Sequence, residues 1–137
     1  MDKIFKPLDL EQVNQLSPLE LAYVGDAVYE LAVRRHLIAR GIVGANRLHR
    51  EAVKYVRADT QAQVLRTLES QLYEEEIRIA KRGRNAKSGH AHRGTCVTAY
   101  RQSTGLESLV GYLFLRGNME RLGFIMQWVF KIVENNE

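Results

Sequence analysis

An apolar stretch from Leu19 to Val33, which carries a carboxylate near its middle, constrains the fold more than any other part of the chain. Wound into a helix, the stretch has apolar residues on nearly every side, and such a helix is normally buried on several faces. We therefore expect its carboxylate, Asp26, to be largely shielded from water. Glu30, one turn further on, has Arg34 as a candidate partner, which leaves Asp26 without a cation. Because a buried ionised carboxylate costs on the order of several kcal/mol unless it is compensated, the sequence predicts a cation, a metal ion or a dense set of hydrogen bonds beside Asp26.

Helical signals repeat along the whole chain, and no alternating pattern long enough for a strand occurs. The 137 residues fit a single domain, residues 1–137, so we expect one all-α domain. Ser17-Pro18-Leu19-Glu20 has the pattern of a capping box with proline at the first helical position, and Gly41 is a typical helix stop. The expected helices cover residues 9–15, 18–40, 47–57 with Asn46 as the cap, 61–68 with Asp59 or Thr60 as the cap, 74–82, 96–115 with Thr95 as the cap, and 119–133.

The remaining composition narrows the class of protein. No apolar run approaches the roughly 18 residues that a membrane span needs, and the N-terminus lacks an apolar signal core, so we expect a cytoplasmic protein without a membrane partner. The single cysteine, Cys96, excludes an internal disulfide, which agrees with a reducing compartment, and we expect it to be a small core residue. The acidic triplet Glu74–Glu76 is expected to complement a helix dipole rather than to act in catalysis.

Positive charge is concentrated in residues 81–93, which hold five of the 20 Lys and Arg residues and no acid. The rest of the chain then carries 15 basic and 16 acidic residues, so the whole excess charge lies in this segment. Its glycines, with Asn85 and Ser88, predict a loop from Gly83 to Gly94. A basic loop of this kind is either a solvated linker or a contact for phosphate groups, and the pair His90 and His92, which lacks a third metal ligand nearby, fits the same two interpretations.

A second carboxylate in apolar surroundings, Glu107, lies in the stretch from Leu106 to Leu115. Gly111 in the same stretch costs about 1 kcal/mol relative to alanine in a helix, so we expect a close helix contact there, and Gly25 can serve the same purpose. Asp26 and Glu107 could then face each other between two helices, where their shared need for positive charge would suit Mg²⁺ and phosphodiester hydrolysis. Arginine partners in structural ion pairs are the alternative, and the residue spacing does not decide between the two.

Three segments resemble one known family in their order and separation. Leu21-Ala22-Tyr23-Val24-Gly25-Asp26-Ala27-Val28 resembles the signature of the ribonuclease III family, and Thr104-Gly105-Leu106-Glu107-Ser108-Leu109-Val110-Gly111 resembles its second acidic motif. Residues 81–89, with Tyr100-Arg101 and Gly111-Tyr112-Leu113-Phe114-Leu115 downstream, are similar to the short bacterial branch of that family. The resemblance covers about residues 14 to 133.

The resemblance implies an all-α helical bundle, the ribonuclease III endonuclease domain, which acts as a homodimer and cuts double-stranded RNA to leave 5′-phosphate and 3′-hydroxyl ends. It implies Mg²⁺, with Mn²⁺ as a substitute, held by Asp26 and Glu107 as the catalytic acids, and it places Tyr23 at the contact between subunits. Ala22 and Thr104 stand where the longer enzymes carry two further metal-binding acids, which leaves the number of metals per site open. The candidate RNA-binding residues are Lys81, Arg82, Arg84, Asn85, Lys87, Ser88, His90, His92 and Arg93.

For the short branch, the implied role is maturation of large-subunit (23S) ribosomal RNA precursors, and we expect no double-stranded-RNA-binding domain in this chain. A non-catalytic RNA-binding ribosome-assembly protein on the same fold is the alternative, because two of the family's acids are missing. A helical protein-interaction module without a nucleic-acid role would leave the basic segment and both acids unexplained.

Overall fold

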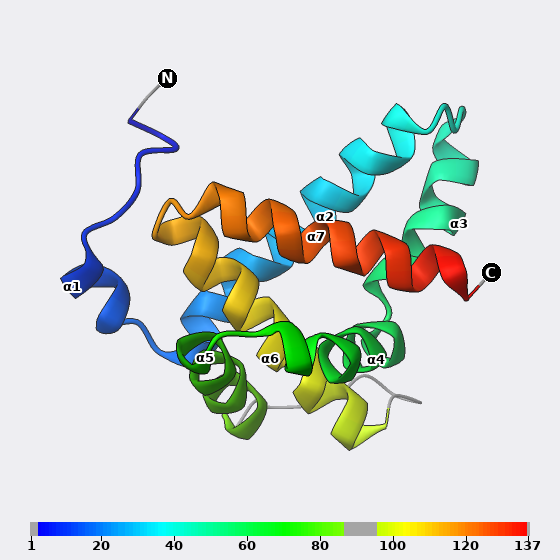
Figure 1. Ribbon diagram of the computed structural model, residues 1–137. Coiled ribbons are helices and arrows are strands. Elements are labelled where there is room, and N and C mark those ends of the chain that lie inside the picture. The colour runs from blue at the N-terminus through cyan, green and yellow to red at the C-terminus, as the bar shows by residue number, and fades with distance from the viewer. Residues whose placement is uncertain (1–2, 87–95, 137) are drawn as a thin grey trace.

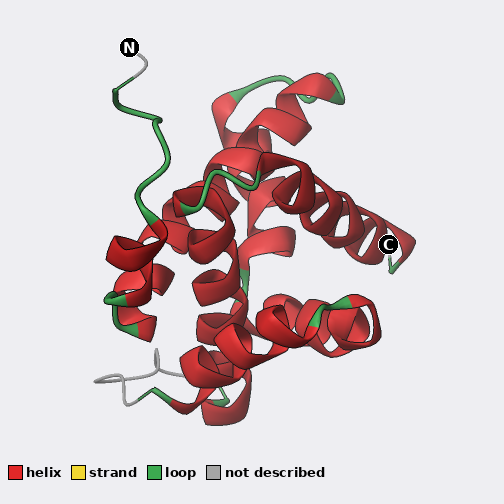
Figure 2. Ribbon diagram, turned by 60° about the vertical axis from the view of Figure 1, so that its left-hand side comes forward, coloured by secondary structure: helices red, strands yellow, loops and turns green. Residues whose placement is uncertain are grey.

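The computed structural model describes residues 3–86 and 96–136, and every regular element in these two ranges is helical. This confirms the all-α fold that the sequence predicts (Figure 2). None of the described helices is long and apolar enough to cross a membrane. The elements are α1 (Leu10–Asn14), α2 (Pro18–Ala39), α3 (Ala45–Val56), α4 (Ala58–Leu68), the 3₁₀ turn η1 (Glu69–Gln71), α5 (Glu74–Asn85), α6 (Val97–Leu115) and α7 (Met119–Asn135).

Helix α6 forms the centre of the fold (Figure 1). Helices α2, α4 and α5 pack around it, and α7 also contacts it. From Ser103 to Leu113 every residue of α6 is buried except Glu107, which is half-buried. Helix α6 has apolar residues on all sides because other helices pack against several of its faces. A side chain carried by this part of α6 is held in place by the surrounding helices.

Two glycines let α2 and α6 cross in backbone contact, as their cost within a helix predicts. A Cβ atom added at Gly25 would overlap the backbone carbonyl of Glu107 and lie 2.8 Å from the backbone nitrogen of Gly111. A Cβ atom added at Gly111 would overlap the carbonyl of Leu21 and lie 3.0 Å from the nitrogen of Gly25. Because Asp26 follows Gly25 directly and Glu107 touches Gly25, this crossing brings the two acids side by side.

Helix α2 begins and ends as the sequence predicts. The Ser17 hydroxyl accepts a hydrogen bond from the Glu20 backbone at 3.1 Å, and the Ser17 backbone donates to the Glu20 carboxylate at 2.8 Å. After the helix ends at Ala39, Gly41 adopts a φ of 85°, in the left-handed region that glycine tolerates. The capping box thus fixes where the helix starts, and so how many turns separate its start from Asp26.

Three of the predicted helix caps are wrong, among them Thr95, because α6 is capped by Cys96. Helix α3 is capped by Gly44 rather than by Asn46, because the left-handed φ of 94° at Gly44 turns the chain into the helix earlier. Helix α4 follows α3 after one residue with extended backbone, Arg57, so neither Asp59 nor Thr60 is its cap. The side chain of Asp59 instead forms an ion pair with Arg57.

Helix α5 runs through Gly83 to Asn85, so the predicted helix end before Gly83 is wrong. A Cβ atom added at Gly83 would lie 3.0 Å from the Cα of Gly105 and would overlap the side chain of Ser108. The glycine therefore permits a close contact between α5 and α6 and does not end the helix. Residues 87–94 of the predicted loop lie outside the described residues.

Two expectations about single side chains also need correction. Cys96 is exposed and caps α6, so it is not a core residue. Glu76 does more than complement the dipole of α5, because it is only 4 % exposed and accepts a hydrogen bond from Arg121 of α7 at 2.7 Å. Glu74 and Glu75 occupy the first turn of α5, the position that the dipole favours. The buried ion pair of Glu76 therefore joins α5 to α7.

Candidate active site

Asp26 and Glu107 meet where α2 and α6 cross. The two side chains share a hydrogen bond, so the structure brings together the two acids that the sequence singled out. Burial, and after it the neighbouring charge of Asp26, raises the pKa of Glu107 to about 8. A low-dielectric environment and a like charge both disfavour the ionised carboxylate. Glu107 therefore holds a proton at neutral pH unless positive charge is brought to the site.

The charged groups that act on Glu107 are acidic. They are Asp26 and Glu30, and both raise its pKa. Arg34 pairs with Glu30 at 2.9 Å, as the sequence suggests, and is thereby engaged. Within the described residues the structure thus shows no arginine partner for Glu107, which was the alternative left open by the residue spacing. Asp26 and Glu107 thus form a pair of acids without a basic partner within the described residues, and a bound cation is one way to compensate such a pair. With Glu30 engaged by Arg34, the described residues hold no group of three His, Cys, Asp or Glu side chains arranged to bind a metal ion.

The exposure of Asp26 differs from the prediction. Asp26 is exposed and Glu107 half-buried, whereas the apolar sequence around Asp26 predicts a side chain shielded from water. The reason is that α2 covers the core with one face only. Its opposite face leaves Tyr23, Leu31 and Ile38 exposed to 83, 66 and 64 % of their surface. The apolar pattern of α2 therefore includes residues that no part of the described chain covers.

Gln61 of α4 completes the site and was missed in the sequence analysis. Its side chain is 1 % exposed and forms a hydrogen bond with Glu107 that lowers the pKa of this acid, against the larger effect of burial. The Gln61 Oε1 atom has no hydrogen-bond partner within the described residues. Gln61 lies four residues before Leu65 and seven before Leu68, on the buried stripe of the helix. A glutamine on the buried apolar stripe of a helix is unusual, and this feature could have identified Gln61 from the sequence.

Ala22 and Thr104 add no carboxylate to the site. Each is 7 % exposed, and the Thr104 hydroxyl donates to the backbone carbonyl of Tyr100 in its own helix at 3.1 Å. These are the positions at which the resemblance places further acids in the longer enzymes. The oxygen atoms of the site therefore come from Asp26, Glu107 and Gln61.

The predicted RNA-binding residues that the structure describes lie at the end of α5, which packs on α6 and also contacts α2. Lys81, Arg82 and Asn85 are exposed, and Arg84 is half-buried. These residues follow one another on a helix rather than on a loop. The other predicted contacts lie outside the described residues, namely Lys87, Ser88, His90, His92 and Arg93.

The helical fold and the pair of acids agree with the outcome of comparison with known proteins. The family model for the ribonuclease III domain matches residues 19–118, a range that contains both Asp26 and Glu107. The chain belongs to the ribonuclease III family. It is therefore an endoribonuclease that acts on double-stranded RNA, and its family generally depends on divalent metal ions.

Its relatives define the branch. The chain is similar to the Mini-ribonuclease 3 of Brevibacillus brevis, with 50 % identity over 121 residues that cover 88 % of this chain and 90 % of that protein. It is 46 % identical over 127 residues to the Mini-ribonuclease 3 of a Thermoanaerobacter species, covering 93 % of this chain and 89 % of that protein. An X-ray crystal structure of a Fusobacterium nucleatum protein superposes with a TM-score of 0.77 and 31 % identity, covering 85 % of this chain and 93 % of the other. The short branch that the sequence resembles is thereby confirmed.

The acid pair allows a test of whether the site fits a metal ion. The buried Gln61 Oε1 atom without a partner and two carboxyl groups in contact provide oxygen atoms only. Hard divalent cations such as Mg²⁺ prefer oxygen ligands and keep several waters when few carboxylates are present. The residues present therefore fit a hard divalent cation that keeps several of its waters.

Proposed function

We propose that this chain is a Mg²⁺-dependent endoribonuclease in which Asp26 and Glu107 hold the metal, with Mn²⁺ as a substitute. The observation that carries the proposal is the contact between the two acids at the glycine crossing, with a raised pKa for Glu107. When bound, Mg²⁺ supplies a polarised water and offsets negative charge on the phosphate. Asp26 and Glu107 provide the ligand oxygens, and the buried Gln61 donates a hydrogen bond that orients Glu107.

The direct test is incubation of the protein with a long RNA duplex, with and without Mg²⁺, followed by sizing of the products and analysis of their ends. We expect cleavage only with the metal, and products with 5′-phosphate and 3′-hydroxyl ends. Binding without metal-dependent cleavage would instead support the alternative, a non-catalytic RNA-binding ribosome-assembly protein.

The proposed natural substrate is the precursor of large-subunit ribosomal RNA in the cytoplasm. Support comes from the Mini-ribonuclease 3 relatives, together with the resemblance of residues 81–89 to the same branch. The basic residues of the segment 81–93 are proposed to bind the RNA, mainly through its backbone. Contacts between cations and phosphates supply affinity with little dependence on sequence.

Gln61 offers a prediction that tests its orienting role. Replacing Gln61 with Leu removes the hydrogen bond to Glu107, so the carboxyl group loses its fixed orientation and its pKa rises further. Loss of a residue that orients a metal ligand typically costs about 10–100-fold in metal affinity or activity, and we expect a decrease in this range. Single-turnover cleavage measured over a range of Mg²⁺ concentrations gives both quantities.

Gln63→Leu provides the matched control for the Gln61 variant, because Gln63 is exposed on the same helix. We expect its metal dependence and cleavage rate to match those of the wild type. Equal rates for the Gln61 and Gln63 variants would show that the hydrogen bond to Glu107 has no role in the reaction.

We also propose that the enzyme is a two-fold symmetric homodimer joined through α2. Tyr23, Leu31 and Ile38 form an exposed apolar stripe along this helix, and such stripes are typical of surfaces that a second protein covers. The stripe also explains why the apolar pattern of α2 extends beyond the face that packs on α6. Two copies joined in this way would shield α2 on both sides.

Tyr23→Asp should therefore dissociate the dimer, because it places a charge at the most exposed apolar residue of the stripe. Sedimentation equilibrium at micromolar concentration should give about twice the chain mass of 15.7 kDa for the wild type and a mass near 15.7 kDa for the variant. Ile4→Asp is the control, since Ile4 is 75 % exposed and lies outside α2. A wild-type protein that sediments as a single chain would contradict the proposed dimer.

A further inference from the structure

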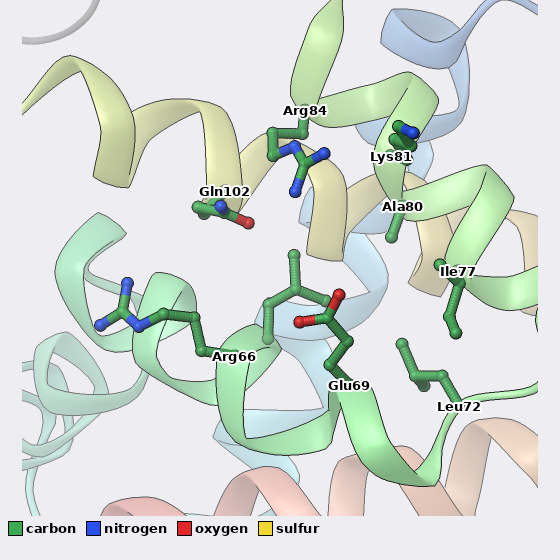
Figure 3. A pocket seen from close by; sticks show the side chains of 9 residues that line it. Arg66, Glu69, Leu72, Ile77, Ala80, Lys81, Arg84 and Gln102 are labelled. Carbon is green, nitrogen blue, oxygen red and sulfur yellow. The ribbon is translucent and has the colours of Figure 1, made fainter.

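A hollow of about 210 Å³ lies between α4, α5 and α6, apart from the contact between Asp26 and Glu107. Aliphatic side chains form part of its wall, and polar side chains from all three helices and from η1 form the rest (Figure 3). Its volume is below the roughly 300–1,000 Å³ of pockets for drug-sized ligands, so it suits a smaller unit. The lining residues are Leu65, Leu72, Ile77 and Ala80, with Arg66, Glu69, Lys81, Arg84 and Gln102.

The charged residues of this hollow make no ion pair within the described residues, and the same holds for some exposed charges elsewhere, such as Arg35 and Arg101. No side-chain hydrogen bond within the described residues involves the four charged residues of the hollow either, namely Arg66, Glu69, Lys81 and Arg84. Arginines elsewhere, such as Arg121, are paired. Three cations and one carboxylate give the hollow an excess of positive charge. Arg66, Glu69 and Lys81 are exposed and Arg84 is half-buried, so water solvates them in the free protein. A ligand that enters the hollow would replace this water with complementary groups, at least one of them anionic.

Three polar groups point into the hollow from three different elements, as Figure 3 shows. Glu69 extends its carboxylate from η1, Arg84 its guanidinium from α5, and Gln102 its amide from α6. Lys81 lies to one side of this group, and Arg66 lies on the other side with its guanidinium directed away from the group. The Glu69 carboxylate can thus accept two hydrogen bonds and the Arg84 guanidinium can donate two. The Gln102 amide and an apolar wall lie beside them.

This set of groups matches guanine better than the other bases. Guanine presents its N1–H and N2–H donors side by side, where a carboxylate such as Glu69 accepts both, and its O6 and N7 acceptors accept a bidentate arginine such as Arg84. Adenine places an acceptor at N1, which a carboxylate would repel, and uracil and cytosine each offer a single donor group to it. The aliphatic wall can take the face of the ring, and Lys81 beside it can take a phosphate.

We propose that the hollow between α4, α5 and α6 is a binding site for one guanine nucleotide, with Glu69 and Arg84 reading the base and Lys81 contacting the phosphate. The nucleotide is either free in solution or an unpaired guanosine of the RNA substrate, and the second case rests on the proposed nuclease function. Gln102 precedes Glu107 by five residues on α6, about 7.5 Å along the helix axis and roughly 140° around it, so the hollow and the acid pair lie on different faces of this helix. An unpaired guanosine would therefore have to come from RNA that extends around α6 beyond the cleaved bond. Bases can leave the stack to enter protein pockets.

The first experiment measures binding of guanosine 5′-monophosphate and adenosine 5′-monophosphate to the full chain in EDTA by calorimetry. The second measures, under the same conditions, the affinity for RNA duplexes that carry one unpaired guanosine, one unpaired adenosine or no unpaired base. In at least one of the two experiments the wild type should prefer guanine roughly tenfold, within the range known for a bidentate base contact. Glu69→Gln should lose this preference, and Glu74→Gln, an exposed acid of α5, should retain it.

The two arms separate the sources of the nucleotide. A preference seen with the mononucleotides alone assigns the site to a free nucleotide, and one seen with the unpaired guanosine assigns it to the RNA. Equal binding of guanine and adenine in both arms, or a guanine preference that survives in Glu69→Gln, would overturn the proposal. Cleavage of the fully paired duplex with Mg²⁺, assayed in parallel, tests the nuclease function separately, because the binding arms contain no metal.

Discussion

Asp26→Asn and Glu107→Gln should each abolish cleavage of duplex RNA while the helical fold is retained. Both substitutions keep the shape of the side chain and remove the negative charge that the proposed metal needs. Stabilisation of the transition state by a bound metal is on the order of several kcal/mol, so we expect a loss of about 100-fold or more in the single-turnover rate. Glu120→Gln, an exposed acid at the start of α7, is the control and should cleave at the wild-type rate. Cleavage near the wild-type rate by either active-site variant would exclude that residue as a metal ligand.

The stability of the same Glu107 variant provides a second readout, without metal or RNA. The pKa of Glu107 is about 8 in the folded protein and ordinarily about 4.5, so between these values the unfolded chain has released a proton that the folded chain still holds. Ionisation therefore favours unfolding, and the stability of the wild type falls as the pH rises through this window. Glu107→Gln does not titrate, so its stability advantage should grow from pH 4.5 to 8 and then level off.

The expected size of this advantage is about 1–3 kcal/mol at pH 8, because Glu107 is only half-buried and solvent reduces the cost of its charge. Urea denaturation of the metal-free protein at several pH values measures it. An advantage that does not change with pH would contradict the raised pKa. An excess of Mg²⁺ should decrease the difference, because a bound cation stabilises the ionised carboxylate.

Gly25→Ala should strongly destabilise the protein, although it adds only one methyl group. The new Cβ atom would overlap the backbone carbonyl of Glu107, and a backbone atom cannot move aside as the end of a flexible side chain can. Separating the two central helices leaves voids along the crossing, and we expect a cost of about 3 kcal/mol or more in the free energy of unfolding. Cleavage should be lost with it, because Asp26 and Glu107 would no longer be in contact. Urea denaturation and the cleavage assay measure the two effects.

Gly123→Ala is the matched control for this variant. Gly123 lies within α7, and a Cβ atom added there meets nothing within 4 Å. Alanine is favoured over glycine in a helix, so we expect this variant to gain about 0.5–1 kcal/mol. If Gly25→Ala proved as stable as the wild type, the close crossing of α2 and α6 would not describe the protein in solution.

Several of these features could be predicted from the sequence because the signals are local. The capping box at Ser17 defines the start of α2, and the cost of glycine inside the apolar stretches predicts the close contacts at Gly25 and Gly111. The sequence also allowed Asp26 and Glu107 to face each other, although their spacing left arginine partners open as the alternative. In each case, nearby residues in the chain or a single contact between two helices account for the type of residue found at that position.

The errors have physical reasons as well. Gly83 was interpreted as a helix stop because glycine serves both as a stop and as a close contact between helices, and only the position of Gly105 decides between the two. The exposure of Asp26 was missed because an apolar pattern does not say whether the same chain or a second copy covers a residue. Gln61 was missed because its partner, Glu107, lies in a distant part of the sequence, where no local spacing relates them.

The glycine crossing also limits how the enzyme can be altered. Because Gly25 and Gly111 each approach the backbone of the opposite helix, main-chain atoms and not core side chains set the spacing between the two acids. Substitutions that change the volume of the core elsewhere should therefore alter stability more than the geometry of the acid pair. An engineer could vary most of the interior to adapt the protein to heat or solvent, while these two positions accept no side chain at all.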